Sequence, residues 1–165
     1  MSSLSFITDQ SLFACVDALL MKANAAQADA VKKFNKNVID PFSPLFEMGG
    51  FNVPHKQWVK SELTRQSQKS VSNSVGVFHQ SILGSVDNWE DLGTGGQVDL
   101  VNHEKQIIAE VKNKYNTVKG SDLKNVYNEL DDLISRKASA YKDYKAYFVS
   151  IIPSRPTLYD IPFTP

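Results

Sequence analysis

The stretch VDLVNHEKQIIAEVKN, residues 98–113, decides the fold. Val98–Val101 is a short apolar run, Asn102–Lys105 is polar and turn-like, and Gln106–Asn113 is a second strand-forming run. Two such runs joined by a short polar segment predict a β-hairpin. Because side chains alternate between the faces of a strand, Glu110 and Lys112 are expected to project side by side, together with Ile108.

The residues that follow the hairpin predict a helix and a further strand. Ser121 is a suitable N-cap for a helix that reaches about Ala140, and its apolar residues recur at helical spacing. Ala146–Ile152, AYFVSII, reads as a strand that Pro153 ends. The helix is long enough to cross over the sheet, so this strand is expected to run parallel to the second hairpin strand.

The residues that precede the hairpin predict two helices separated by a loop. Asp9–Val38 and His55–Leu83 carry apolar residues at helical spacing. Asp40–Pro54 contains two prolines and the pair Gly49-Gly50, and we expect it to be a loop. Ser85–Gln97 is glycine-rich, with room for one short strand.

Together these elements predict an α/β fold with a mixed central β-sheet flanked by helices. A chain of 165 residues suits a single domain, with a helical part at about residues 1–60 and a core at about 63–153. Apolar residues make up 42% and charged residues 22%, as in soluble globular proteins, and no run approaches the ~20 apolar residues of a membrane span. The single cysteine, Cys15, and the lack of a signal-like N-terminus favour the cytoplasm.

The net charge argues mildly against a protein that coats nucleic acid without selectivity, because it is zero overall. The charge is nevertheless uneven. From Val111 to Gly120 the chain has three lysines, Lys112, Lys114 and Lys119, and no acidic residue. A local basic patch of this kind is compatible with binding to phosphates.

Three hairpin residues suggest phosphodiester chemistry. Asp99 lies on one predicted strand, and Glu110 and Lys112 lie on the other. Two neighbouring carboxylates suit Mg²⁺, which prefers oxygen ligands and leaves positions for water and phosphate, and the backbone carbonyl of Val111 offers a further ligand. Lys112 would then orient or deprotonate the attacking water and stabilise the developing negative charge.

The acid-x-lysine element is a weak signal when it stands alone. It occurs three times, at Glu110–Lys112, Asp122–Lys124 and Asp143–Lys145. Only the first copy lies inside an apolar strand whose predicted partner also carries an acid. The alternative is a solvent-facing hairpin with ordinary polar alternation, and the pattern alone leaves both interpretations open.

Val98-Asp99, a ten-residue gap and Glu110-Val111-Lys112, followed by a helix and a strand, resemble the core of the PD-(D/E)XK nucleases. Valine replaces the proline of the family name. More closely, VDLVNHEKQIIAEVKNKYNTVKGSDL and SVGVFHQSILG resemble the type II restriction endonucleases that cut at GGNCC. The resemblance covers roughly residues 63–153. It implies a restriction-endonuclease-like core and magnesium-dependent double-strand cleavage of DNA that leaves 5′-phosphates.

The resemblance also implies partners and further site residues. A palindromic target implies a homodimer, and a restriction-modification system implies a cognate DNA methyltransferase. Nucleases of this class often present a polar or acidic side chain from the helix before the sheet, and Glu62 is the candidate. The expected DNA contacts are Asn113 at the end of the predicted strand and Lys114, Tyr115, Asn116 and Lys119 after it, with Lys69 and Asn73 on the helix. For all of these residues the alternative is ordinary solvent exposure.

Two other functions stay open at this point. The resembling endonucleases continue well beyond DIPFTP, where this sequence stops, so one alternative is an inactive truncated remnant or a DNA-binding module. The other is a repair or junction nuclease built on the same core.

Overall fold

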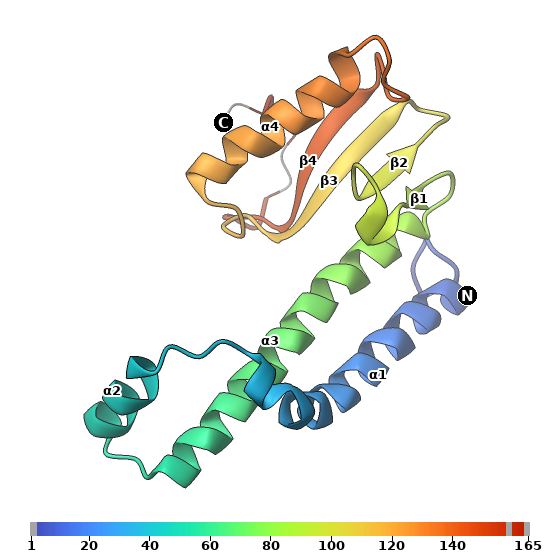
Figure 1. Ribbon diagram of the computed structural model, residues 1–165. Helices are drawn as coiled ribbons and strands as arrows, with labels where there is room; N and C mark the ends of the chain where they lie inside the picture. Colours follow the sequence, from blue (N-terminus) through green and yellow to red (C-terminus); the bar gives the residue numbers. More distant parts are fainter. Residues whose placement is uncertain (1–2, 158–159, 164–165) are drawn as a thin grey trace. The chain divides into compact units, whose positions relative to one another are not determined.

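The computed structural model describes residues 3–157 and 160–163. Its elements run in the order α1 (Asp9–Lys33), η1 (Phe34–Lys36), α2 (Phe42–Phe51), α3 (His55–Gly84), β1 (Glu90–Asp91), η2 (Gly93–Gly95), β2 (Leu100–Asn102), β3 (Ile107–Lys114), α4 (Gly120–Ser135) and β4 (Lys145–Ile152) (Figure 1). They form two units, which we name the sheet unit (Met1–Cys15 with Gly76–Pro165) and the helical unit (Val16–Val75).

The four strands of the sheet unit form one sheet in the order β1-β2-β3-β4. β1 and β2 are antiparallel, β2 and β3 are antiparallel, and β3 and β4 are parallel (Figure 1). The hairpin, the mixed sheet and the parallel crossover that the sequence predicts are therefore confirmed. The short strand allowed for in residues 85–97 is β1.

The first hairpin strand is shorter and later than predicted. β2 begins at Leu100, and Val98 and Asp99 lie in a bend before it. The physical reason is a side-chain bond, because the Val111 N–H donates to Asp99 Oδ2 at 2.7 Å. At the hairpin turn, the Lys105 N–H donates to Asn102 Oδ1 at 2.8 Å, which helps to close the turn.

Helix α4 covers one face of the sheet, and the core lies between them (Figure 1). Val101 and Ile108 from the hairpin are fully buried, at 0% exposure, and Leu130 of α4 packs against them. α4 begins one residue before Ser121, and the predicted N-cap at Ser121 is wrong. Lys119 takes that position because its extended backbone lets its carbonyl accept from Asp122 and Leu123, both at 2.9 Å. The helix ends at Ser135, before the predicted Ala140.

The helical unit contains most of α1 and α3 together with α2. The prediction of a loop over Asp40–Pro54 is wrong, since Phe42–Phe51 is helical. Pro44 is tolerated because it lies in the first turn, where backbone N–H groups have no partner within the helix. The helix ends where Asn52 adopts a left-handed conformation, with φ 51°.

No helix in the described part of the chain is long and apolar enough to cross a membrane. Cys15 is a free, half-buried thiol.

Candidate active site

Asp99 lies in the bend immediately before β2, where three elements meet. Its Oδ2 accepts from the Val111 N–H of β3 at 2.7 Å. Its backbone carbonyl accepts from the Leu92 N–H at 3.0 Å and from Gln80 Nε2 of α3 at 3.3 Å. The Asp99 main chain and side chain are thus held by bonds to β3, to the end of β1 and to α3.

Glu110 and Lys112 lie two residues apart on β3, as predicted, and Lys112 Nζ is 2.5 Å from Glu110 Oε1. Both side chains are partly exposed, at 22% for Glu110 and 27% for Lys112. Asp99 Oδ2 accepts from the N–H of Val111, the residue between Glu110 and Lys112, so the Asp99 side chain lies beside this part of β3. The structure therefore brings the three predicted residues to one place on the hairpin.

The chemistry of these donors suits a hard divalent cation. Asp99 Oδ1 and Glu110 Oε2 have no hydrogen bond to any of the residues 3–157 and 160–163. Across those residues no cluster of three or more His, Cys, Asp or Glu side chains is placed to hold a metal ion. A cation here would take two carboxylate ligands and fill its shell with backbone carbonyl, water or phosphate oxygens, which suits Mg²⁺ better than Zn²⁺.

A polar network behind Asp99 was missed by the sequence analysis. Gln80 Nε2 donates both to the Asp99 carbonyl and to Asp91 Oδ1, the latter at 2.8 Å. Asp91 Oδ2 accepts from Ser81 Oγ at 3.2 Å, and Asp91 Oδ1 also accepts from the Gly93 N–H at 2.9 Å. The signal for this network was the polar pair Gln80-Ser81 inside an apolar helix stripe.

The close approach of α3 to β1 depends on a glycine. A Cβ added to Gly84 would lie 2.5 Å from the Cβ of Asp91 and 3.0 Å from its backbone nitrogen. No other residue fits without displacing β1. Gly84, the last residue of α3, therefore allows Gln80 and Ser81 to reach Asp91.

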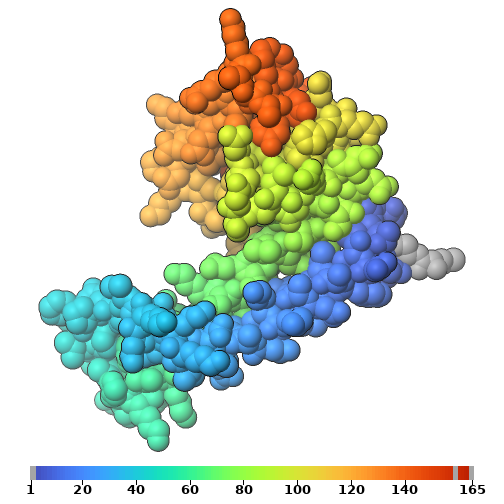
Figure 2. All heavy atoms as spheres, turned by 45° about the vertical axis from the view of Figure 1, so that its right-hand side comes forward, coloured from blue at the N-terminus to red at the C-terminus, as the bar shows by residue number. Residues whose placement is uncertain are grey.

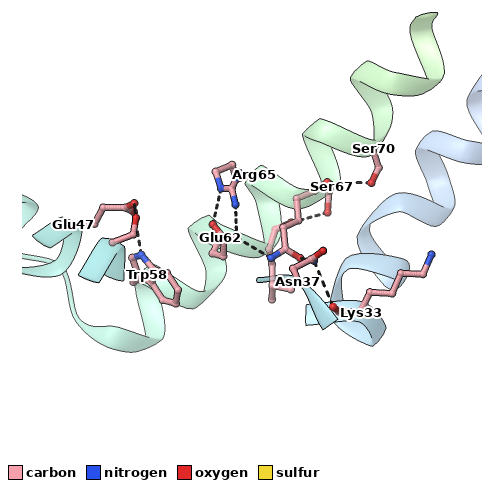
Figure 3. A network of polar contacts seen from close by, with 11 residues as sticks. Lys33, Asn37, Glu47, Trp58, Glu62, Arg65, Ser67 and Ser70 are labelled. Atoms are coloured by element: carbon pink, nitrogen blue, oxygen red, sulfur yellow. Dashed lines mark hydrogen bonds and ion pairs between the residues drawn. The ribbon is translucent and has the colours of Figure 1, made fainter. Parts of the chain in front are cut away.

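Glu62 belongs to the helical unit, where its carboxylate is fully engaged (Figure 3). Arg65 Nε and Nη2 donate to its two oxygens, each at 2.6 Å, and Gln66 Nε2 donates to Oε1 at 2.8 Å. Hydrogen bonding by Arg65 lowers the pKa of Glu62, although burial opposes this effect. Asn37 Nδ2 extends the network by donating to Gln66 Oε1 at 2.7 Å. Within the helical unit the carboxylate of Glu62 is thus fully bonded, and its predicted catalytic role stays a prediction.

The last residue of β3 and the loop that follows it present most of the predicted DNA contacts to solvent. The exposed members are Lys114, Tyr115, Asn116 and Lys119. The loop is ordered by its backbone, because the Tyr115 N–H donates to the Ile152 carbonyl and the Thr117 N–H to the Lys114 carbonyl, both at 3.0 Å.

Two other sets of predicted DNA contacts lie elsewhere. Asn113 is half-buried, and its Oδ1 is buried without a partner among the described residues. Lys69 and Asn73 are exposed on α3, in the helical unit. All of these residues keep their predicted roles as predictions.

The family model described as the Eco47II restriction endonuclease matches residues 4–163. The chain belongs to this family. The type II restriction enzyme Eco47II of Escherichia coli is 56% identical over 165 residues, which cover 100% of this chain and 69% of that enzyme. The type II restriction enzyme Sau96I of Staphylococcus aureus is 35% identical over 153 residues, which cover 92% of this chain and 57% of that enzyme. No solved structure matches the chain.

Membership of the Eco47II restriction endonuclease family confirms the class that the sequence analysis expected. The chain is of the type II restriction endonuclease class, which consists of site-specific deoxyribonucleases. The match also covers the hairpin with Asp99, Glu110 and Lys112.

Proposed function

We propose that this chain hydrolyses DNA phosphodiester bonds at a specific double-stranded site, with Asp99, Glu110 and Lys112 as its catalytic residues. The observation that carries the proposal is the meeting of these three side chains on the β2–β3 hairpin of a restriction endonuclease family member. Their partial exposure leaves the site accessible to a phosphate.

Asp99 and Glu110 are the proposed ligands of Mg²⁺, with the Val111 carbonyl as a further ligand. When bound there, Mg²⁺ supplies positive charge that polarises the scissile phosphate and makes a coordinated water more acidic. Asp99 Oδ2 keeps its bond to the Val111 N–H, so Oδ1 is the oxygen that faces the cation. This bond holds the two carboxylate-bearing strands in register.

Lys112 is proposed to act on the attacking water. Its Nζ is paired with Glu110 Oε1 in the structure, which holds the ammonium beside the expected cation position. From there the protonated Nζ can orient the water, and its positive charge stabilises the developing pentavalent phosphate, whereas only the neutral amine could accept the proton of the water.

The remaining expectations concern DNA recognition and partners. The GGNCC site, the homodimer and the cognate methyltransferase rest on the family resemblance and on the symmetry of a palindrome. The exposed Lys114, Tyr115, Asn116 and Lys119 are the proposed contacts next to the cut. A restriction enzyme must reach DNA, so the proposed location is the bacterial cytoplasm.

A supercoiled-plasmid digest tests the proposal. With Mg²⁺ we expect linear products and discrete bands from a long DNA that carries several GGNCC sites, and with EDTA we expect no cleavage. Methylated DNA from a host that carries the cognate methyltransferase should resist the enzyme and serves as the control.

The same digest separates the alternatives. DNA binding without cleavage in Mg²⁺ would favour an inactive remnant or binding module. Nicking that follows DNA structure, without discrete bands, would favour a repair or junction nuclease.

A further inference from the structure

Helix α2 carries an exposed apolar stripe, which we name the α2 face. Its members are Phe42, Leu45, Phe46 and Gly49, spaced i, i+3, i+4 and i+7, so they lie on one side of the helix. Phe42 is 62% exposed, Leu45 61% and Phe46 76%. Figure 2 shows the α2 segment, in cyan, at the surface.

Except at the C-terminal end of the helix, where Phe51 is 74% exposed, the opposite side of α2 is the one that packs. Ser43, Pro44 and Met48 are half-buried there. Glu47 Oε2 accepts from Trp58 Nε1 of α3 at 3.0 Å, and Trp58 itself is only 6% exposed (Figure 3). The α2 face is therefore presented outward by a helix that is tied down on its other side.

The α2 face carries no free charge. Glu47 is the one charged residue of α2, and it lies on the opposite side of the helix, where Oε1 accepts from Ser43 Oγ at 2.9 Å and Oε2 from Trp58. In a two-fold interface the same patch meets its own copy, so any net charge would repel itself. A neutral apolar face satisfies this condition.

We propose that the α2 face is the surface through which two copies of this chain associate. The inference rests on the proposed function, which requires two copies at a palindromic site and does not say which surface joins them. Each helix would lay its two phenylalanines and Leu45 against those of its partner, and Gly49 would allow close approach of the two backbones.

The size of the face agrees with this role. A phenylalanine side chain offers on the order of 200 Å², so Phe42, Phe46 and Leu45 together expose roughly 400 Å². An interface of standard size takes about 800 Å² from each partner, of which somewhat more than half is apolar. The α2 face thus supplies most of the apolar area that one partner contributes, and the polar rim would come from its surroundings.

Sedimentation velocity of the full chain, without DNA, tests the inference. We expect the parent to be a dimer at micromolar concentrations, and Phe46→Glu to weaken association by roughly 30-fold or more, the effect of losing a central interface anchor. Gly49→Glu is the second variant, because a Cβ at Gly49 meets nothing within 4 Å and the fold of the monomer is undisturbed. Met21→Glu is the matched control, since Met21 is 73% exposed on α1 outside the α2 face.

A monomeric parent, or a dimer that survives both α2 variants, would overturn the inference. So would an equal loss of association in Met21→Glu, because the effect would then be one of added charge alone. The plasmid digest is scored separately. A parent that dimerises through the α2 face but never cuts DNA would refute the proposed function and leave the proposed interface intact. An active enzyme whose α2 variants still dimerise would refute the proposed interface and leave the proposed function intact.

Discussion

At the scale of the single residue, Asp99 has one observed role and one proposed role, and the two use different atoms. Oδ2 fixes the hairpin by accepting from the Val111 N–H, and Oδ1 remains for a cation. Replacement by alanine would remove both roles and leave the Val111 N–H without its acceptor. An experiment on the metal role therefore needs a substitution that keeps the acceptor.

Asp99→Asn is that substitution. Its amide oxygen can still accept from the Val111 N–H, but the charge that attracts Mg²⁺ is lost. We expect cleavage to fall by at least about a hundredfold with little change in thermal stability. Initial rates over a Mg²⁺ titration, together with thermal denaturation, measure both effects. Unchanged cleavage in this variant would remove Asp99 from the set of metal ligands.

Lys112→Ala tests the role of the ammonium group. Loss of a group that orients or deprotonates the attacking water should lower the cleavage rate by about 10²–10⁴-fold, while DNA binding measured in Ca²⁺ stays largely intact. Lys145→Ala is the control, because Lys145 is an exposed lysine on the neighbouring strand, paired with Ile107 at the other end of β3. If Lys112→Ala cuts plasmid as fast as the parent, the assigned role is wrong.

At the scale of the element, α3 joins the site through its C-terminal turn. Gln80 and Ser81 hold Asp91, and Gln80 also holds the Asp99 carbonyl. These bonds are possible because residue 84 is a glycine, and the absence of a Cβ there leaves room for Asp91. The geometry of the end of the helix thus sets the position of Asp99, a proposed metal ligand.

Gly84→Val should therefore displace β1 and destabilise the protein, by about 1–3 kcal/mol for an overpacked contact. Gly76→Ala in the same helix is the matched control. A Cβ at Gly76 meets nothing within 4 Å, so alanine there should stabilise the helix by about 0.5–1 kcal/mol. Urea denaturation measures both changes, and equal effects at the two glycines would contradict the packing argument.

The N-terminal half of α3 contains the second element-scale prediction. The pKa of Glu62 is lowered by its hydrogen bonds to Arg65, so the ionised carboxylate stabilises the folded state. This contribution is fully present above the pKa of the unfolded chain and is lost as pH falls through the lower pKa of the folded state. Stability should therefore decline as pH drops below about 4.5, the ordinary glutamate value.

Glu62→Gln should remove the contribution that the ionised carboxylate makes to the stability of the folded state. The variant should be less stable than the parent at pH 7, by about 1–3 kcal/mol for a buried bond to a charged group, and the difference should shrink as the pH falls. Thermal denaturation from pH 3 to pH 7 measures it. A constant difference across this range would show that Glu62 is not ionised in the folded protein.

At the scale of the whole molecule, the predicted functions divide between the two units. Asp99, Glu110 and Lys112 belong to the sheet unit, and the α2 face belongs to the helical unit. Substitutions on the α2 face are therefore expected to act through association, and substitutions in the hairpin through chemistry. Because the two experiments measure different properties, one can fail without the other.

Local patterns were enough to predict the parts of the molecule that depend on neighbouring residues. The hairpin, the crossover helix and the shared face of Glu110 and Lys112 follow from strand alternation and helical spacing, which act over a few residues. The meeting of Asp99 with Glu110 was predictable for the same reason, because a short hairpin turn sets the register. Asp40–Pro54 was predicted as a loop because of its prolines, but proline is also tolerated in the first turn of a helix. Ser121 was predicted as the N-cap because serine favours that position, but serine also occurs within the first turn.

The amino-acid sequence by itself determined the mixed α/β sheet, the hairpin that carries the proposed catalytic residues, and the enzyme class, since these reside in short-range patterns and in a family resemblance over roughly residues 63–153. Only the tertiary structure decided that Gln80, bonded to Asp91, supports Asp99. It also decided that Arg65 donates hydrogen bonds to the carboxylate of Glu62, and that the apolar residues of the α2 face are exposed. The physical reason is the range of the interactions. Which side chain a buried polar group bonds, and which face of a helix is covered, depends on contacts between residues that are distant in the chain, and no local periodicity records them.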